Sequence, residues 1–297
     1  MVGRNIQEHC GADNYELLTP TRTELDLTHN PATLAYLEKH QPDIVIHAAG
    51  KVGGIQANIK EPVQFLLANL DMGRNIVWGA RQTGIKRLIN LGSSCMYPRG
   101  HNEPLTEDMV LSGELEPTNE GYALAKVTTA RLCDYIVRED PRFQYKTLIP
   151  SNLYGRFDKF DPRHSHLIPA IILKIHEAMR SRQSTVEIWG DGTARREFMY
   201  AGDLADAVFR AVEQFESLPQ YMNVGLGFDH TINQYYQAVA DVLGYQGSFV
   251  HDLARPVGMA RKLVSVTRQK AWGWSSRHTL EEGIARTYDY YLKEYRS

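Results

Sequence analysis

The chain has 297 residues, of which 43% are hydrophobic and 23% are charged, and its formal net charge is −2 at pH 7. This composition is typical of a globular protein and excludes a disordered chain. The balanced charge excludes a general attraction to nucleic acid or to an anionic membrane, although it leaves room for a local basic pocket. A membrane span needs about 20 apolar residues, and no apolar run approaches that length. The start has no signal-peptide pattern.

The cysteines Cys10, Cys95 and Cys133 are far apart and odd in number. They therefore indicate neither a disulfide framework nor a metal site. Free thiols are typical of a reducing compartment, so we expect a cytoplasmic protein.

The first stretch, residues 1–22, reads MVGRNIQEHCGADNYELLTPTR, and its pattern predicts a helix followed by a strand. A parallel α/β sheet normally begins with a strand. We therefore expect a sheet whose first strand is missing from this sequence.

Short apolar runs rich in β-branched residues then alternate with helical patterns. The expected strands are 43–50, 86–94 and 145–155, and the expected helices are 61–84 and 119–140. This alternation predicts a Rossmann-like, doubly wound parallel sheet with right-handed crossovers, in a domain over residues 1–155. In such a sheet, ligands bind at the carboxyl ends of the strands.

The alternation breaks after this domain. The remaining patterns predict a helix at 166–181, a strand leading into a charged loop at 184–198, and further elements at 222–227, 231–245 and 279–295. We expect residues 156–297 to form mainly a smaller α/β lobe that binds substrate, with some segments returning to the first domain.

Tyr122 and Lys126 are four residues apart in the expected helix at 119–140, so they share one face. A lysine cation beside a phenol favours the phenolate, and we expect a lowered pKa for Tyr122. Alone, this spacing also fits an amphipathic helix with a surface lysine. However, Ser93 ends the preceding expected strand, where its hydroxyl can hold a carbonyl oxygen while Tyr122 donates a proton to it. The three residues predict a carbonyl-reducing site.

Longer motifs around these residues follow one another in a specific order. They are AAGKVGGI, LGSSCMYP, EPTNEGYALAK, PSNLYG, SHLIPA and RREF. Together they resemble the GDP-L-fucose synthase family, epimerase-reductases of the extended short-chain dehydrogenase/reductase superfamily, over nearly the whole chain. The resemblance implies epimerisation at C3 and C5 of GDP-4-keto-6-deoxy-D-mannose, followed by reduction of the C4 ketone with NADPH.

The resemblance also implies roles for single residues. Ser93, Tyr122 and Lys126 fall on the reductive triad, in which Tyr122 protonates the C4 oxygen and Lys126 also holds the nicotinamide ribose. Cys95 and His166 fall on the epimerisation base and acid. We expect Lys126 and the positive ring of the cofactor to favour the Cys95 thiolate.

From the residues alone, Cys95 also fits a small buried side chain and His166 a helix-entry histidine. His164 competes with His166 for the acid role, and the spacing to the LIPA motif favours His166.

The expected second strand ends at residues 19–22, where NAD-binding proteins usually carry an acidic residue. A guanidinium suits a 2′-phosphate instead, so Arg22 favours NADP(H) over NAD unless it is an ordinary surface arginine. We expect Asp26 at the adenine edge, Ala48 and Ala49 where the backbone approaches the cofactor, and Pro150–Leu153 at the nicotinamide. The full expected cofactor set is Gly3, Arg22, Asp26, Ala48, Ala49, Leu91, Gly92, Ser93, Ser94, Lys126, Pro150, Ser151, Asn152, Leu153 and His166.

By the same resemblance, the GDP part of the substrate binds to Lys174, Trp189, Arg196 and Lys262. Cations neutralise the diphosphate, and an indole packs against a base or sugar. Lys174 stands where the family commonly has arginine, which keeps the charge but loses the planar fork.

The segment around Lys262 departs from the family pattern. Val257 and Ser265 replace aspartates, and Met259 replaces a threonine. These departures leave the exact sugar nucleotide open. The alternative is an enzyme of the GDP-colitose synthase type, which epimerises only C5 and acts on a 3,6-dideoxy sugar.

Gly3 matches the last glycine of the family's fingerprint G-x-x-G-M-V-G, whose other glycines do not occur in this chain. We therefore expect Met1 to be an internal methionine of a longer natural chain, and expect weak NADPH binding and low stability. A catalytically silent Rossmann-like binding protein is a second alternative. The helical stretches 62–80 and 125–137 are the expected face of a homodimer.

Overall fold

The computed structural model describes residues 1–161, 165–254 and 260–295. Its α-helices are α1 (Val2–Gln7), α2 (Asn30–His40), α3 (Ile55–Lys60), α4 (Pro62–Gln82), α5 (Glu120–Glu139), α6 (Leu167–Arg180), α7 (Ala201–Glu213), α8 (Ile232–Leu243), α9 (Thr267–Ala271) and α10 (Leu280–Tyr295). Its strands are β1 (Ile44–His47), β2 (Arg87–Leu91), β3 (Gln144–Pro150), β4 (Asn152–Tyr154), β5 (Thr185–Trp189), β6 (Arg195–Arg196), β7 (Phe198–Tyr200), β8 (Tyr221–Val224), β9 (His230–Thr231), β10 (Ser248–Asp252) and β11 (Arg261–Lys262). Short 3-10 helices are η1 (Cys10–Asn14), η2 (Ser94–Met96), η3 (Glu107–Met109), η4 (Pro117–Asn119) and η5 (Phe215–Ser217).

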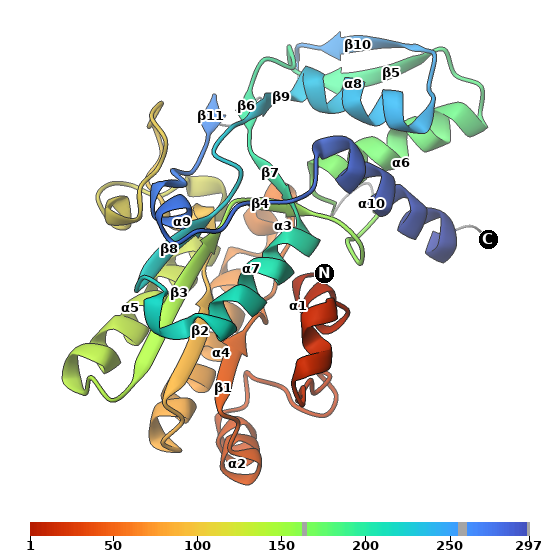
Figure 1. Cartoon of the computed structure of the whole chain (residues 1–297). Helices are drawn as coiled ribbons and strands as arrows, with labels where there is room; N and C mark the ends of the chain where they lie inside the picture. Colours follow the sequence, from red (N-terminus) through yellow and green to blue (C-terminus); the bar gives the residue numbers. More distant parts are fainter. Residues whose placement is uncertain (162–164, 255–259, 296–297) are drawn as a thin grey trace.

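A parallel sheet in the order β1-β2-β3-β8 forms the centre of the larger lobe (Figure 1). Ile46 pairs with Ile89 across the first two strands. Helices α2, α4 and α5 pack on one face of the sheet, and α1 and α7 pack on the other. The structure confirms the predicted Rossmann-like parallel sheet, and it also shows that β8 returns from the C-terminal half to complete it.

Local sequence explains how the long helices begin, end and meet. Pro62 opens α4, where its missing N–H costs no hydrogen bond, and Gly84 turns the chain after it with φ of 80°. Helices α4 and α5 approach closely at Gly73, where a Cβ would lie 2.1 Å from the Thr129 hydroxyl. This contact therefore tolerates only glycine.

The strand predicted before residue 22 is not present in the described structure. Residues 15–20 belong to no helix or strand of the described structure, and Tyr15 and Leu18 are each 38% exposed. The prediction was wrong because a strand needs a neighbour that satisfies its backbone groups, and no described strand supplies one here. The preceding helix is confirmed as α1, which packs against α7.

The smaller lobe is built on the parallel pair β5 and β10, which α6, α8 and α10 cover (Figure 1). A capping box starts α8: the Thr231 hydroxyl accepts from the Gln234 amide N–H at 3.1 Å, and the Gln234 side chain accepts from the Thr231 N–H at 2.8 Å. Two small sheets, β4-β7 and β11-β6-β9, lie between the lobes.

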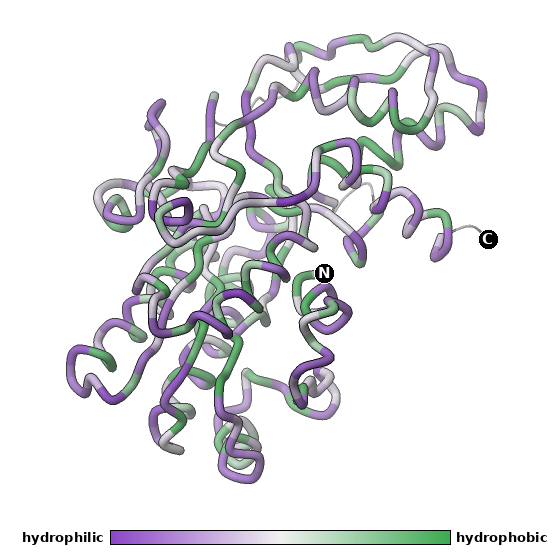
Figure 2. The backbone as a smooth tube through the Cα atoms, in the orientation of Figure 1, coloured by the Kyte–Doolittle hydropathy of each residue, from purple (hydrophilic) through white to green (hydrophobic). Residues whose placement is uncertain are grey.

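Apolar residues follow the strands of the larger sheet, and polar residues gather at the loops (Figure 2). Within the described ranges, no helix is long and apolar enough to cross a membrane. The same residues contain no group of histidine, cysteine and carboxylate side chains suited to a metal ion.

Candidate active site

Three of the predicted catalytic residues meet at the carboxyl end of β2. Tyr122 and Lys126 lie one turn apart on α5, and Ser93 follows β2 directly. The Ser93 and Tyr122 side chains are hydrogen-bonded to each other. The Lys126 ammonium donates to the carbonyl oxygen of Leu91 at 2.8 Å and lies 6.0 Å from the centre of the Tyr122 ring. The arrangement places a hydroxyl pair and a cation where a carbonyl group can be polarised.

The expected pKa of Tyr122 was wrong in direction. Burial raises the pKa of Tyr122, the neighbouring Cys95 raises it further, and the hydrogen bond from Ser93 lowers it only in part. Burial also lowers the pKa of Lys126 to about 8. The phenol is therefore protonated at neutral pH, the form that can donate to a carbonyl oxygen.

His47, at the end of β1, was missed by the sequence analysis. It is buried, and burial together with the nearby Lys126 lowers its pKa to about 3. The imidazole is therefore neutral beside the lysine and adds no second charge.

Cys95 lies on η2, and its sulfur faces two donors. The Asn119 side-chain amide is 3.1 Å from Cys95 Sγ, and the Lys262 ammonium is 3.6 Å from it. The Cys95 backbone N–H points to the Ser93 hydroxyl at 3.3 Å. The cation in contact with this sulfur is thus Lys262 from β11. It is not Lys126, as the sequence analysis expected, because the Lys126 ammonium donates to the Leu91 carbonyl.

His166 lies directly before α6. It interacts electrostatically with Asp158, a buried carboxyl that the sequence analysis missed. Burial raises the pKa of Asp158, and the charge of a protonated His166 opposes this shift. No spacing in the sequence pointed to Asp158, because it lies in a loop.

The loop after β1 connects the lysine end of the site with the histidine end. A Cβ on Gly50 would lie 4.0 Å from Lys126 Nζ, and one on Gly54 would lie 3.5 Å from the Ser165 carbonyl oxygen. The Asn69 side chain holds this loop, accepting from the Lys51 N–H at 2.9 Å and donating to the Lys51 carbonyl at 3.0 Å. Ser165, the residue before His166, therefore borders the same loop as Lys126.

The residues expected at the cofactor divide into two groups. Gly3, Arg22 and Asp26 belong to the N-terminal segment, where Arg22 is exposed and its guanidinium lies 3.7 Å from the Asp26 carboxylate. The others, apart from Lys126 on α5 and His166 at the start of α6, lie at strand ends: Ala48 and Ala49 after β1, Leu91 to Ser94 at β2, and Pro150 to Leu153 at β3 and β4. Ser151 has a buried hydroxyl without a hydrogen-bond partner in the described residues.

The residues expected at the substrate form two pairs. The Lys174 ammonium lies 5.2 Å from the centre of the half-exposed Trp189 ring. Arg196 and Lys262 are register partners of the paired strands β6 and β11. Asp229, which is almost fully buried, accepts from Arg195 at 2.6 Å and from Arg261 at 2.5 Å, and so fixes this pairing.

The departures from the family pattern near Lys262 are only partly visible. Val257 and Met259 lie outside the described residues. The Ser265 hydroxyl is 3.1 Å from the Thr267 hydroxyl, and its carbonyl accepts from Asn223 at 3.0 Å. In this structure Ser265 therefore takes part in a structural network.

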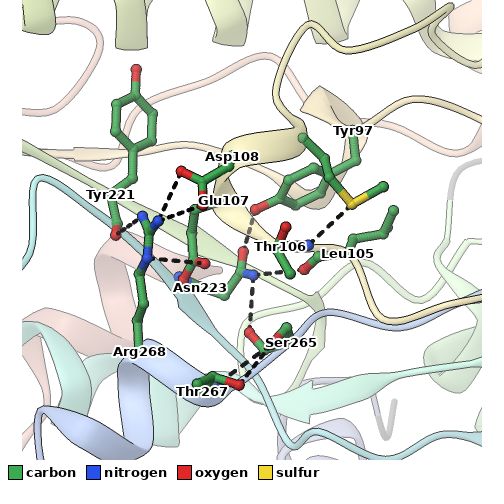
Figure 3. Close-up of polar contacts among 11 residues, drawn as sticks. Tyr97, Leu105, Thr106, Glu107, Asp108, Tyr221, Asn223, Ser265, Thr267 and Arg268 are labelled. Carbon is green, nitrogen blue, oxygen red and sulfur yellow. Dashed lines mark hydrogen bonds and ion pairs between the residues drawn. The ribbon is translucent and has the colours of Figure 1, made fainter.

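That network surrounds Asn223 on β8 (Figure 3). The Asn223 side chain accepts from the Tyr97 hydroxyl at 2.5 Å and donates to the Leu105 carbonyl at 2.9 Å. Its backbone N–H donates to the buried Glu107 carboxylate at 2.8 Å, and Arg268 lies 3.5 Å from the same carboxylate. The network joins the segment after Cys95 to the segment after Lys262.

A cavity of about 430 Å³ lies beside this region, lined by Arg99, Gly100, His101, Asn102, Glu114, Glu116, Ala260 and Arg261. None of the predicted catalytic side chains lines it. It borders the substrate pairs through Glu116, whose charge acts on Arg196.

Comparison with known proteins gives consistent relatives. A family model described as "NAD dependent epimerase/dehydratase family" matches residues 1–225. A GDP-L-colitose synthase of Yersinia pseudotuberculosis is 55% identical over 294 residues, which cover 99% of this chain and 96% of that protein. A GDP-L-fucose synthase of Azorhizobium caulinodans is 50% identical over 292 residues, 98% of this chain and 93% of that protein.

A solved structure shares the architecture over its whole length. It is MlghC, a GDP-mannoheptose C4 reductase from Campylobacter jejuni with NADP bound. It superposes with a TM-score of 0.88 at 26% identity and covers 98% of this chain and 95% of that chain.

Proposed function

Because the chain belongs to the NAD dependent epimerase/dehydratase family, we propose that it is an NADPH-dependent epimerase-reductase of a GDP-linked 4-keto-6-deoxy sugar. It converts GDP-4-keto-6-deoxy-D-mannose to GDP-L-fucose by epimerisation at C3 and C5 and reduction at C4.

One observation supports this function more than any other. The reducing trio of Ser93, Tyr122 and Lys126 shares the end of β2 with Cys95, whose sulfur lies within reach of Lys262 on β11, between the lobes. A plain reductase needs only the trio. A second proton-transfer group at the same strand end suits an enzyme that also inverts carbons beside the ketone.

In the reduction, Ser93 and Tyr122 bind the C4 oxygen. NADPH supplies the hydride when bound. Tyr122 is protonated at neutral pH because burial raises its pKa, so it gives its proton to the oxygen as the hydride reaches the carbon. Lys126 holds positive charge close to the forming alkoxide and lowers the free energy of the transition state.

In the epimerisation, the hydrogens at C3 and C5 are acidic because both carbons neighbour the C4 ketone. Cys95 removes the proton from one ring face, and His166 returns a proton to the opposite face. The same Tyr122 and Ser93 hydroxyls stabilise the enolate oxygen, so one site serves both reactions. Asp158 is a buried carboxyl that interacts electrostatically with His166 in this scheme.

The strand ends fit a dinucleotide cofactor. Ser151 offers a buried hydroxyl that has no hydrogen-bond partner in the described residues, and Lys126 Nζ is placed to hold a ribose. Ala48 and Ala49 have small side chains where a cofactor would pass the backbone. Arg22 would bind the 2′-phosphate of NADP, and Asp26 and Gly3 complete the set on the N-terminal segment. The NADP in the MlghC structure supports this choice.

The GDP part belongs to the smaller lobe, over residues 156–297, while residues 1–155 hold the cofactor. Trp189 stacks on the guanine or a sugar, and Lys174, Arg196 and Lys262 neutralise the diphosphate. Lys174 and Trp189 form one pair on α6 and β5, and Arg196 and Lys262 form the other on β6 and β11. The positions of the two pairs support a substrate that crosses between the lobes.

A colitose-type reaction is the second candidate, with epimerisation at C5 only and a 3,6-dideoxy substrate. The colitose synthase is more similar to this chain than the Azorhizobium fucose synthase, at 55% against 50% identity. Both reactions use the same catalytic groups.

We further propose a homodimer in the cytoplasm. On α4 and α5, the exposed apolar side chains are Val63, Leu67, Trp78, Leu124 and Tyr135. Helix pairs of this kind bury their apolar faces against a second copy. The three free thiols suit a reducing compartment. Light scattering on a size-exclusion column tests the dimer, and a monomer at micromolar concentration contradicts it.

The experiment mixes the purified full chain with NADPH and either GDP-4-keto-6-deoxy-D-mannose or its 3-deoxy analogue. Oxidation of the nicotinamide is followed by absorbance, and NMR of the product assigns C3 and C5. The Tyr122→Phe variant is the matched control. A folded wild-type chain that oxidises NADPH with neither substrate overturns the proposal, and NADPH binding without turnover supports a silent binding protein.

A further inference from the structure

The Cys95 sulfur is held between two donors that belong to different parts of the chain. Asn119 ends η4, immediately before α5, and Lys262 ends β11. Their nitrogen atoms lie 3.1 Å and 3.6 Å from Cys95 Sγ. Cys95 itself is half-buried.

The chemistry of these donors favours an anionic sulfur. An ammonium group has three hydrogens and no acceptor, so it can only donate to the sulfur. A thiolate accepts such bonds strongly, whereas a thiol accepts them weakly and must place its own proton elsewhere. A positive charge at this distance stabilises the anion directly. Salt screens this attraction less at a partly buried site than at an exposed one.

Rigid contacts hold both donors in place. The Asn119 backbone N–H donates to the Glu116 carbonyl at 3.2 Å, and the Asn119 side-chain oxygen is buried without a hydrogen-bond partner in the described residues. On the other side, Asn223 joins Tyr97, two residues after Cys95, to Ser265, three residues after Lys262 (Figure 3). Asn223 on β8 therefore links the segment that carries the sulfur to the segment that carries the ammonium.

We propose that Asn119 and Lys262 are positioning residues that together hold Cys95 as a thiolate, the form in which it acts as the epimerisation base. The inference rests on the proposed function and deepens it. Lys262 thereby has a second role beside its contact with substrate. It also follows that proton removal at C3 and C5 depends on Lys262 of β11, in the sheet between the lobes.

The step balances without any further reactant. The Cys95 thiolate takes the proton from the carbon beside the ketone, an S–H bond forms, and the C–H electron pair moves into the enolate. The enolate oxygen is held by Tyr122 and Ser93. His166 then donates a proton to the opposite face, the electron pair returns to carbon, and solvent exchange restores the thiolate and the imidazolium.

The test measures the reactivity of Cys95 without the sugar substrate. The full chain is treated with iodoacetamide across a pH series, and alkylation of the Cys95 peptide is followed by mass spectrometry. Exposed Cys10 gives an internal reference, and Cys133 is buried. We expect the midpoint of the Cys95 profile to rise by about one pH unit in Lys262→Met, corresponding to a tenfold change in thiolate stability. Asn119→Ala gives a smaller rise in the same direction.

Matched variants separate this role from a structural one. Lys262→Arg keeps the positive charge, so its Cys95 midpoint stays close to that of the wild type. Lys270→Met removes an equal charge from the exposed side of α9 and leaves the Cys95 midpoint unchanged. Circular dichroism confirms that each variant is folded. Unchanged midpoints in both folded Lys262→Met and Asn119→Ala overturn the proposal.

A second measurement connects the thiolate to epimerisation. The chain is incubated with GDP-4-keto-6-deoxy-D-mannose in deuterated water without NADPH, and uptake of deuterium at C3 and C5 is followed by NMR. We expect Asn119→Ala to slow this exchange about tenfold and Lys270→Met to leave its rate unchanged. An unchanged exchange rate in folded Asn119→Ala overturns the link. If Lys262→Met shifts the Cys95 alkylation midpoint but the wild type turns over no sugar, the thiolate site stands and the proposed function is refuted.

Discussion

The Tyr97 hydroxyl donates to the Asn223 side chain at 2.5 Å, and this bond ties β8 to the segment that follows β2. Both side chains are buried, at 3% and 0% exposure. The bond joins β8 to the segment that contains Cys95, two residues before Tyr97. Its loss therefore affects both stability and the geometry of the site.

The Tyr97→Phe substitution tests this bond. It leaves the Asn223 oxygen buried without its donor, so we expect the free energy of unfolding to fall by about 1–3 kcal/mol. Urea unfolding followed by tryptophan fluorescence measures the change. The matched control is Tyr135→Phe, since Tyr135 is half-exposed on α5. Equal unfolding midpoints for the two variants contradict the expected role of Tyr97.

Removal of the Tyr122 hydroxyl tests the proton donor. We expect Tyr122→Phe to lower kcat for NADPH oxidation by about 10²–10⁴-fold, because proton donation to the C4 oxygen is lost. The affinity for NADPH, measured by calorimetry, stays close to that of the wild type. A variant that keeps more than a tenth of the wild-type kcat shows that another group donates the proton.

The pH dependence of reduction follows from Lys126. Burial lowers its pKa to about 8, so the folded protein loses this positive charge as the pH rises through that value. Tyr122 stays protonated there, because burial raises its pKa. We expect kcat/KM for the ketone to fall above about pH 8. A flat profile from pH 7 to pH 10 is the contrary result.

Glu197 predicts a pH dependence of stability. This buried carboxyl accepts from the Val264 N–H at 2.9 Å and the Gly227 N–H at 3.1 Å, yet burial raises its pKa to about 7. A carboxyl with a raised folded pKa stays protonated in the folded state while the unfolded chain ionises. Stability therefore falls as the pH rises from about 4.5 to about 7, by on the order of 3 kcal/mol, and is level above that range.

The Glu197→Gln variant supplies the control for that dependence. It cannot ionise, so its free energy of unfolding stays flatter between pH 4.5 and pH 7 than that of the wild type. Urea unfolding at several pH values compares the two proteins. Parallel curves show that another buried group is responsible.

Local patterns in the sequence determined much of this protein. Apolar runs predicted the strands that became β1, β2 and β3, because a buried parallel strand needs a continuous apolar segment whatever its neighbours are. The spacing of Tyr122 and Lys126 placed both on one helical face for the same local reason. The motifs around Ser93 and Cys95 identified the family.

Other features depended on contacts between distant segments. The stretch at residues 15–20 has a strand-like sequence but no neighbour to pair with, so pattern alone misjudged it. The pKa of Tyr122 rose because burial, which only the folded chain decides, outweighs the effect of a lysine one turn away. Likewise, the cation at Cys95 is Lys262, far along the chain, since β6, β8 and their hydrogen bonds bring β11 to the end of β2. Local sequence sets which elements form, and tertiary packing sets which charges meet.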